Sequence, residues 1–246
     1  MADRSRTARS VPAAVVWDAL RALVAATPGG TGLDVVDVGG GTGGLAVQLA
    51  ELGHRVTVVD PSPDALASLE RRAGEAGVAV HAVQGDAAGL LEVVEAGSAD
   101  LVLCHGVLEH VDDVAPAVAA LAGVLRAGGT LSLLVAGRNA VVLARAIAGR
   151  LAEAHHALDD PSGRWGTTDP LPRRFTEAQV VGLLVDAGLQ ITAVHGVRSF
   201  ADLVPGALVD AEPGATDALL ALEAAVADRP DFRAVATQLH VLATRG

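Results

Sequence analysis

The sequence predicts an α/β fold: a doubly wound, mainly parallel sheet with helices on both faces. Short valine-rich apolar runs alternate along the chain with longer segments whose apolar residues recur at helical spacing. The clearest unit begins with the β-branched run Val35–Val38, turns at a glycine cluster and continues as a helical segment, Leu45–Ala50. Strand, tight turn and helix in this order form the repeating unit of such sheets.

Length and composition are typical of one well-buried domain with an appendage. The chain has 246 residues, of which 51% are hydrophobic, so extensive disorder is not expected. No apolar run reaches the ~18–20 residues that span a bilayer, and residues 1–10 lack the apolar segment of a secretory signal. The single cysteine, Cys104, excludes an internal disulfide and a metal site of several cysteines. We therefore expect a cytoplasmic protein with no membrane or disulfide partner.

The charge balance bears on the kind of partner. The formal net charge is −11, and every basic residue is an arginine, because the chain contains no lysine. An acidic protein is not drawn broadly to phosphate backbones, and no local basic patch is obvious in the sequence.

The other elements follow from periodicity and from glycine and proline punctuation. Arg126–Gly129 is predicted to end a helix, and residues 140–174 to form a helix plus an irregular lid. The last two strands are predicted to be antiparallel. The predicted strands are Arg55–Val59, Val78–Val83, Ala99–Cys104, Thr130–Val135, Leu189–Val197 and Gln238–Thr244; the predicted helices are Val11–Ala26, one opened by Pro61 and Pro63, Val114–Leu125, Thr176–Ala187 and Ala215–Ala227.

The glycine cluster after the first strand predicts a ligand site. Gly39, Gly40, Gly41 and Gly43 let backbone N–H groups at a helix N-terminus approach a ligand that no side chain blocks. The spacing fits the dinucleotide fingerprint, and it also resembles the first motif of class I S-adenosylmethionine (SAM) methyltransferases. Asp37 favours the second, since a carboxylate there would lie near the pyrophosphate of a dinucleotide.

Acidic residues follow the next two predicted strands. Asp60 lies about 20 residues beyond the glycines, where an acidic residue accepts both ribose hydroxyls; the alternative is a helix cap. Asp86 and the N–H of Ala87 suit the amine and ring of an adenine, although Gly85-Asp86 is equally typical of a turn.

The fourth predicted strand leads into His105, Glu109 and His110, the candidate catalytic bases. Strand C-termini in such sheets face the ligand crevice, so His105 is also a candidate cofactor contact. Cys104 is interpreted as a small core residue. The adjacent histidines 155 and 156 lack the spacing of metal ligands, and we assign no metal site.

Several segments carry a closer resemblance. They are Val107–Glu109, Leu125–Leu133, Asp186–Ile191, Gly196–Phe200 and Leu239–Val241, in this order. So patterned, the chain resembles the bacterial tRNA 5-carboxymethoxyuridine methyltransferase family from Trp17 onward. The resemblance implies a Rossmann-like, seven-stranded class I methyltransferase fold with a helical lid insert. It also implies SAM as cofactor, held at Gly39, Gly40, Asp60, Asp86 and His105.

The same resemblance implies four regions: an N-terminal arm and helix (1–30), a SAM-binding core (31–136), a lid or substrate insert (137–175), and a C-terminal part completing the sheet (176–246). It implies methyl transfer to an oxygen nucleophile, as in the carboxylate of a modified wobble uridine of tRNA. The candidate substrate residues are Asn139, Trp165, Arg173, Arg174 and Arg198.

The chain departs from the family where a nucleic acid would be held. A lysine-rich loop becomes residues 159–165, a Tyr-Asn-Ala-Asn segment becomes residues 136–139, and His-Asp-Tyr becomes residues 201–203. The family's N-terminal SAM-contacting arginine is replaced by Pro12, with Arg9 the nearest candidate. Losing basic and aromatic groups weakens phosphate attraction and base stacking. A small-molecule O- or N-methyltransferase is therefore the alternative, ahead of a nicotinamide-dependent oxidoreductase or a non-catalytic SAM-binding protein.

Overall fold

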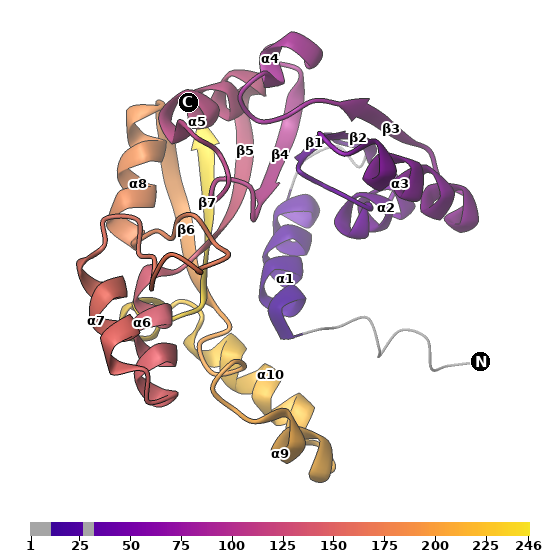
Figure 1. Cartoon of the computed structure of the whole chain (residues 1–246). Coiled ribbons are helices and arrows are strands. Elements are labelled where there is room, and N and C mark those ends of the chain that lie inside the picture. The colour runs from indigo at the N-terminus through magenta and orange to yellow at the C-terminus, as the bar shows by residue number, and fades with distance from the viewer. Residues whose placement is uncertain (1–10, 27–31) are drawn as a thin grey trace. The chain divides into compact units, whose positions relative to one another are not determined.

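The computed structural model describes residues 11–26 and 32–246 (Figure 1). They form one seven-stranded mixed sheet in the order β3-β2-β1-β4-β5-β7-β6, with helices between successive strands. The predicted doubly wound fold is confirmed. The strands are β1 (Asp34–Val38), β2 (Arg55–Asp60), β3 (Val80–Gln84), β4 (Ala99–His105), β5 (Leu125–Ala136), β6 (Leu189–Val197) and β7 (Gln238–Arg245).

The chain divides into two compact units, each described by itself below. We call Gly29–Val135, Ala178–Ala193 and Val241–Gly246 the strand unit, and Met1–Pro28, Ala136–Glu177 and Val194–His240 the lid unit. The helices are α1 (Val11–Ala26), α2 (Gly44–Glu51), α3 (Pro63–Ala76), α4 (Leu90–Val93), α5 (Val114–Val124), α6 (Arg138–Ile147), α7 (Leu151–Asp159), α8 (Glu177–Asp186), α9 (Gly206–Ala211), α10 (Ala215–Val226) and α11 (Pro230–Arg233).

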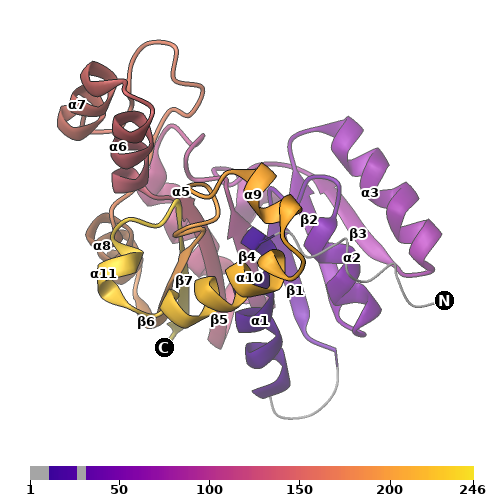
Figure 2. The same ribbon diagram turned by 90° about the horizontal axis from the view of Figure 1, so that it is seen from below.

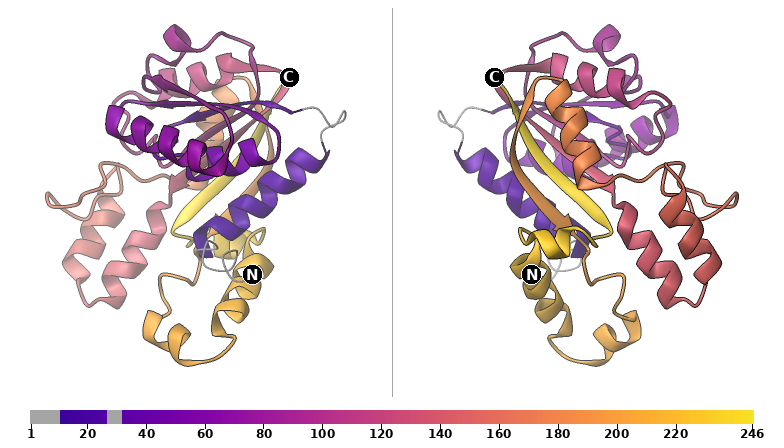
Figure 3. Two further views of the ribbon diagram at one scale, coloured as in Figure 1. Left: turned by 90° about the vertical axis from the view of Figure 1, so that its right-hand side faces the viewer. Right: turned by 90° about the vertical axis from the view of Figure 1, so that its left-hand side faces the viewer.

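In the strand unit the parallel strands β1, β2 and β4 have buried centres, whereas β3, at the edge of the sheet, has no buried residue. β1 pairs with both β2 and β4, and all three have valine- or leucine-rich sequences that bury residues of both faces. α2 and α3 pack on each other and against β2 and β3, and α5 packs against β4 (Figure 3). Ser62 caps α3 by accepting a hydrogen bond from the N–H of Ala65 at 3.2 Å. Parallel pairing brings the carboxyl ends of β1, β2, β3 and β4 to one edge, where ligands bind in such sheets.

The start of β5 corrects the sequence prediction. Arg126–Gly129 was expected to separate a helix from a strand beginning at Thr130, but the strand already begins at Leu125, directly after α5. Leu125 pairs with Ala99, and an irregularity in register precedes the next pair, Leu101 with Thr130. The extra residues form a bulge in which Gly128 has a φ of +76°. The two glycines therefore lie within the bulge of β5, whereas the sequence predicted that they would precede the strand.

The insert after β5 also differs from expectation. One helix plus a lid was predicted, whereas the structure has the pair α6 and α7 packed together, followed by an irregular segment, residues 160–176 (Figure 2). We call this segment the lid loop. Gly149 has a φ of +73° and breaks the helical run between the two helices. The short helices α4, α9 and α11 carry no periodicity long enough to predict.

In the lid unit α1 packs on α10, and Trp17 of α1 is buried. The predicted helices Val11–Ala26 and Ala215–Ala227 are thus confirmed to within one residue. Arg9 lies outside the described residues. No helix in residues 11–26 and 32–246 is long and apolar enough to cross a membrane.

Candidate functional site

The strand unit contains a cavity of about 400 Å³ at the carboxyl ends of its parallel strands. Gly39 follows β1, Asp86 and Ala87 follow β3, and His110 follows β4. These four sequence-predicted residues line the cavity together. The remaining lining residues are Val38, Pro61, Ala88, Val107, Val111, Asp112, Asp113 and Pro116.

The glycine loop, Gly39–Gly43, turns the chain from β1 into α2. Gly39, Gly41 and Gly43 have backbone φ values of +72°, +55° and +78°, which residues other than glycine rarely adopt. A Cβ at Gly39 would lie 2.3 Å from Val107 Cγ2, and one at Gly43 would lie 2.1 Å from Leu69 Cδ1. Those two glycines therefore serve the packing of the fold. Gly41 differs, because a Cβ added there would lie 3.9 Å from the nearest heavy atom, Oδ2 of Asp60.

Asp37 lies directly beneath the glycine loop. Its side chain is buried, and a Cβ at Gly40 would lie 2.5 Å from its Oδ2. Burial, together with the nearby charge of Asp60, raises the pKa of Asp37 to about 7. No arginine or histidine forms an ion pair with either carboxylate among the residues that the structure describes. Asp37 and Asp60 thus form a pair of neighbouring carboxyl groups with no cationic side chain beside them in the described chain.

Asp60 fastens the glycine loop to the end of β2. Its Oδ2 accepts a hydrogen bond from the N–H of Gly41 at 2.9 Å, and its Oδ1 accepts one from the N–H of Ser62 at 2.9 Å. The alternative interpretation of Asp60 as a helix cap is wrong, because Ser62 is the N-cap residue of α3 and Asp60 instead binds the N–H groups of Gly41 and Ser62. Each carboxylate oxygen has a second lone pair, so both retain capacity for a ligand hydroxyl.

Asp86 also has a structural task. Its Oδ1 accepts hydrogen bonds from the N–H groups of Ala88 and Gly89, at 3.0 and 2.9 Å, which shape the turn before α4. Ala87 is buried. Both the turn and the adenine interpretation remain compatible with this geometry, because the turn uses only one of the two carboxylate oxygens.

The three candidate bases differ in environment. His105 Nε2 lies 2.9 Å from the hydroxyl of Ser132 on β5, and burial lowers the pKa of His105 to about 4. Glu109 is buried, whereas His110 is exposed and lines the cavity. His105 is consequently uncharged at neutral pH. Cys104 is fully buried, and burial raises the pKa of its thiol, as expected of a core residue.

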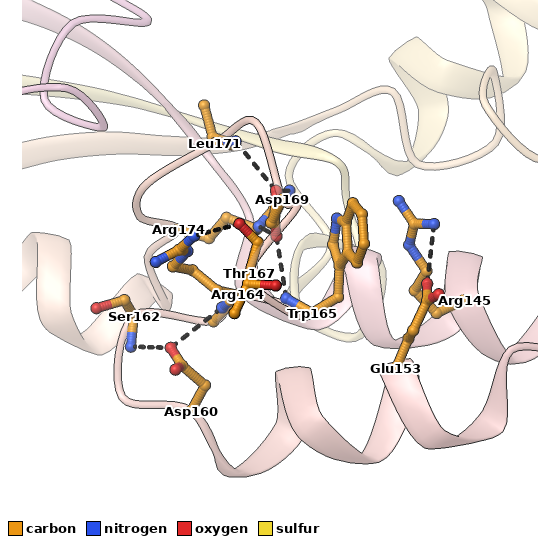
Figure 4. A network of polar contacts seen from close by, with 11 residues as sticks. Arg145, Glu153, Asp160, Ser162, Arg164, Trp165, Thr167, Asp169, Leu171 and Arg174 are labelled. Carbon is orange, nitrogen blue, oxygen red and sulfur yellow. Dashed lines mark hydrogen bonds and ion pairs between the residues drawn. The ribbon is translucent and has the colours of Figure 1, made fainter.

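The predicted substrate residues belong to the lid unit. Trp165 and Arg174 belong to one network in the lid loop (Figure 4). Arg174 binds both carboxylate oxygens of the buried Asp169, at 2.7 and 3.1 Å, and Asp169 accepts further N–H groups from Trp165 and Leu171. Burial opposes ionisation of Asp169, but these donors hold its pKa below the usual value.

The other lid-unit candidates are engaged as well. The guanidinium of Arg145 stacks 3.9 Å from the centre of the Trp165 ring. Arg198 forms an ion pair with Asp202. Asn139 donates a hydrogen bond to the carbonyl of Ala234 at 2.8 Å. Arg173 is partly buried. Among the described residues, no group of three or more His, Cys, Asp or Glu side chains is arranged to hold a metal ion.

Sequence reasoning missed part of the cavity lining. Val107, Val111 and Pro116 are apolar loop and helix residues that look like core positions, so no pattern distinguishes them. Asp112 and Asp113 did carry a signal, since two successive acidic residues follow the fourth strand.

The fold is that of a class I SAM-dependent methyltransferase. A family described as a methyltransferase domain matches residues 36–133. A tRNA 5-carboxymethoxyuridine methyltransferase of Escherichia coli (strain K12) is 31% identical over 237 residues, covering 94% of this chain and 87% of that enzyme. The chain belongs to the same methyltransferase family as that enzyme, and its cofactor is SAM. The dinucleotide alternative is thereby set aside.

Other similar proteins share the fold or the core. A ubiquinone biosynthesis O-methyltransferase of Xanthomonas axonopodis pv. citri (strain 306) is 34% identical over 167 residues, covering 68% of this chain and 66% of that enzyme. A SAM-dependent methyltransferase from Mesorhizobium loti has a TM-score of 0.61 and 24% identity, covering 96% of this chain and 100% of that one. Magnesium protoporphyrin IX methyltransferase from Synechocystis PCC 6803, solved with bound SAH, has a TM-score of 0.64 and 19% identity, covering 100% and 89%.

Proposed function

We propose that this enzyme methylates an oxygen nucleophile of a small molecule. The observation that carries the proposal is that three arginines of the lid unit already bind carboxylates or backbone carbonyls of the same unit. Arg174 is paired with Asp169, and Arg198 with Asp202. Arg138 donates to the backbone carbonyls of Leu158, Asp160 and Pro161, so it holds the end of α7. A polyanion is held by cations that release counterions on binding, and paired arginines contribute little to that release.

We further propose that the strand-unit cavity and the glycine loop hold the cofactor. When bound, SAM supplies an activated methyl group on a positively charged sulfur, so alignment of the reacting atoms contributes most to the rate. Asp37 and Asp60 provide negative charge for this cationic molecule. The free lone pairs of Asp60 suit its ribose hydroxyls, and Asp86 with Ala87 suits its adenine. His105, uncharged at neutral pH, imposes no repulsion on it.

A hydroxyl acceptor needs a base, whereas a carboxylate acceptor does not. Of the three candidates, His110 is the one that lines the cavity and is exposed. His105 is a weak base because its pKa is about 4, and Glu109 is buried. We propose His110 as the base for a hydroxyl acceptor.

A second candidate is methylation of tRNA. It is favoured by the full-length similarity to the E. coli enzyme, which bears that activity in its name. One experiment separates the candidates: the enzyme is incubated with methyl-labelled SAM and an extract of its own organism. The extract is then divided into a tRNA fraction and a small-molecule fraction. Label in the small-molecule fraction, insensitive to ribonuclease, is the expected result, and label confined to tRNA overturns the proposal.

The cofactor roles are tested by titration calorimetry with SAM. Asp60→Ala is expected to weaken SAM binding by ~1.5–3 kcal/mol, the loss typical of hydrogen bonds to a charged group. Asp64→Ala is the matched control, because Asp64 is an exposed acidic residue in the first turn of α3. Equal affinities for the two variants would remove Asp60 from the proposed site.

A further inference from the structure

The lid unit encloses a cavity of its own, of about 240 Å³. Its walls are the end of β5, the inner side of α6, the lid loop and the segments after β6 and before β7. Most lining side chains are alanine, valine or leucine, and Arg174, Ser199, Asp202 and Thr237 supply the polar groups. This volume corresponds to about eight water molecules and falls below the ~300 Å³ typical of sites for larger ligands. The cavity therefore fits a small molecule that makes a limited number of polar contacts.

Its charges cancel locally. Arg174 lines the cavity but is paired with Asp169, whose side chain is 0% exposed. Asp202 lines the cavity and is paired with Arg198. A charged ligand would find no uncompensated opposite charge in these pairs, and it would lose its hydration on entry. The cavity thus favours an uncharged ligand whose hydroxyl donates to the carboxylate of Asp202.

The wall that carries Asp202 is preorganised. Arg198 has a φ of +61° and is the one non-glycine residue with positive φ in the described chain. The buried carboxylate of Glu223 accepts the N–H groups of Ser199, Phe200 and Ala201 at 2.9, 2.9 and 2.8 Å. Ser199 is buried, and its hydroxyl has no hydrogen-bond partner among the described residues. Backbone held in a rarely populated conformation by a buried anchor is typical of binding sites.

We propose that this cavity is a binding site for uncharged, largely apolar molecules that bear a hydroxyl group. This site belongs to the lid unit alone, and ligand binding there does not depend on the proposed function. Ala136, Ala140 and Leu171 would contact the apolar body, and Asp202 would accept the hydroxyl hydrogen. A phosphate or carboxylate of similar size would be excluded by the paired charges.

The first test measures binding of two probes of equal length, 4-propylphenol and 4-propylbenzoate, by ligand-observed NMR without cofactor. The phenol is expected to bind at least tenfold more tightly than the benzoate. Ala140→Phe fills the cavity from α6 and is expected to lower phenol affinity at least tenfold. Ala146→Phe is the matched control on the same helix, exposed and away from the cavity, and is expected to bind as the unmodified enzyme does.

The second test uses Asp202→Asn, which keeps the shape of the side chain and leaves Arg198 without its counterion. Phenol binding is expected to weaken about fivefold while benzoate binding increases, which inverts the preference. Equal binding of both probes to the unmodified enzyme, or undiminished phenol binding by Ala140→Phe, would overturn the proposal. Because these measurements involve no methyl transfer, that result would leave the labelling experiment, and so the proposed function, to stand or fall separately.

Discussion

The two units differ in whether their buried carboxylates have ion-pair partners. In the strand unit, Asp37 and Asp60 lie close together beneath the glycine loop with no ion-pair partner in the described chain. In the lid unit, the carboxylates of Asp169 and Asp202 each have an arginine. Uncompensated buried charge costs folding free energy unless a ligand of opposite charge completes it. Paired charge is complete without a ligand, so removing one partner destabilises the protein, and the intact pair offers no free charge to a charged ligand.

This difference separates residues kept for the cofactor from residues kept for the fold. Removing a partner from the paired region should destabilise the protein and leave SAM affinity unchanged. Removing the buried carboxylate of Asp37 from the strand unit should do the reverse, raising stability and weakening SAM binding.

The largest effect is expected from Arg174→Ala. It leaves Asp169 buried without its guanidinium, which typically costs ~3–5 kcal/mol. Urea unfolding should report this loss, and hydrogen exchange should show faster opening at the amides of Trp165 and Leu171, which donate to Asp169. Arg150→Ala, which breaks an exposed pair with Glu153, is the control and should cost below ~1 kcal/mol. Similar losses for both variants would show that the lid network is not a stabilising unit.

The next effect is expected from Asp37→Asn. The pKa of Asp37 is raised from 3.8 to about 7, so the folded protein resists its ionisation and stability is lost as pH rises through about 7. The amide removes that loss. At pH 8 the cofactor-free variant should be more stable by ~2–4 kcal/mol, the upper figure being the full value of the pKa change. Below pH 4 the two proteins should be nearly equal in stability at this position, as urea unfolding at both pH values would reveal.

The same residue predicts a pH-dependent affinity for the cofactor. A cationic ligand favours the ionised carboxylate, so SAM affinity should rise as pH increases through about 7 and binding should release a proton. Calorimetry in two buffers of different ionisation enthalpy measures that proton directly. Asp37→Asn should abolish both the release and the pH dependence. Proton release unchanged in the variant would assign it to another group.

The sequence predicted the strand unit well because its signals are local. A valine-rich run, a glycine cluster and a helical segment occur within 16 residues and together predict a strand, a turn and a helix. Asp60 and Asp86 were predicted as site residues because they lie at the ends of predicted strands. The lid unit depends on contacts between distant residues. Glu223 on α10 accepts hydrogen bonds from the backbone N–H groups of residues 199–201, and no spacing in the sequence predicts these contacts. Arg198 and Asp202 are only four residues apart, but they lie in an irregular segment where no periodicity predicts their pairing, and Arg198 was therefore predicted only as a substrate residue.

The smallest effect distinguishes a glycine kept for the fold from one kept for the cofactor. Gly41 and Gly77 both have positive φ, +55° and +71°, and a Cβ at either would have open space, with nothing nearer than 3.9 Å at Gly41 and nothing within 4 Å at Gly77. Replacement by alanine should therefore cost each about the same, ~1 kcal/mol of stability, from the left-handed backbone alone. Only Gly41→Ala should also weaken SAM binding, by about tenfold, because its methyl group would point into space that the cofactor needs. Urea unfolding and calorimetry on the two variants give both quantities, and equal SAM affinities would mean that Gly41 is a turn residue like Gly77.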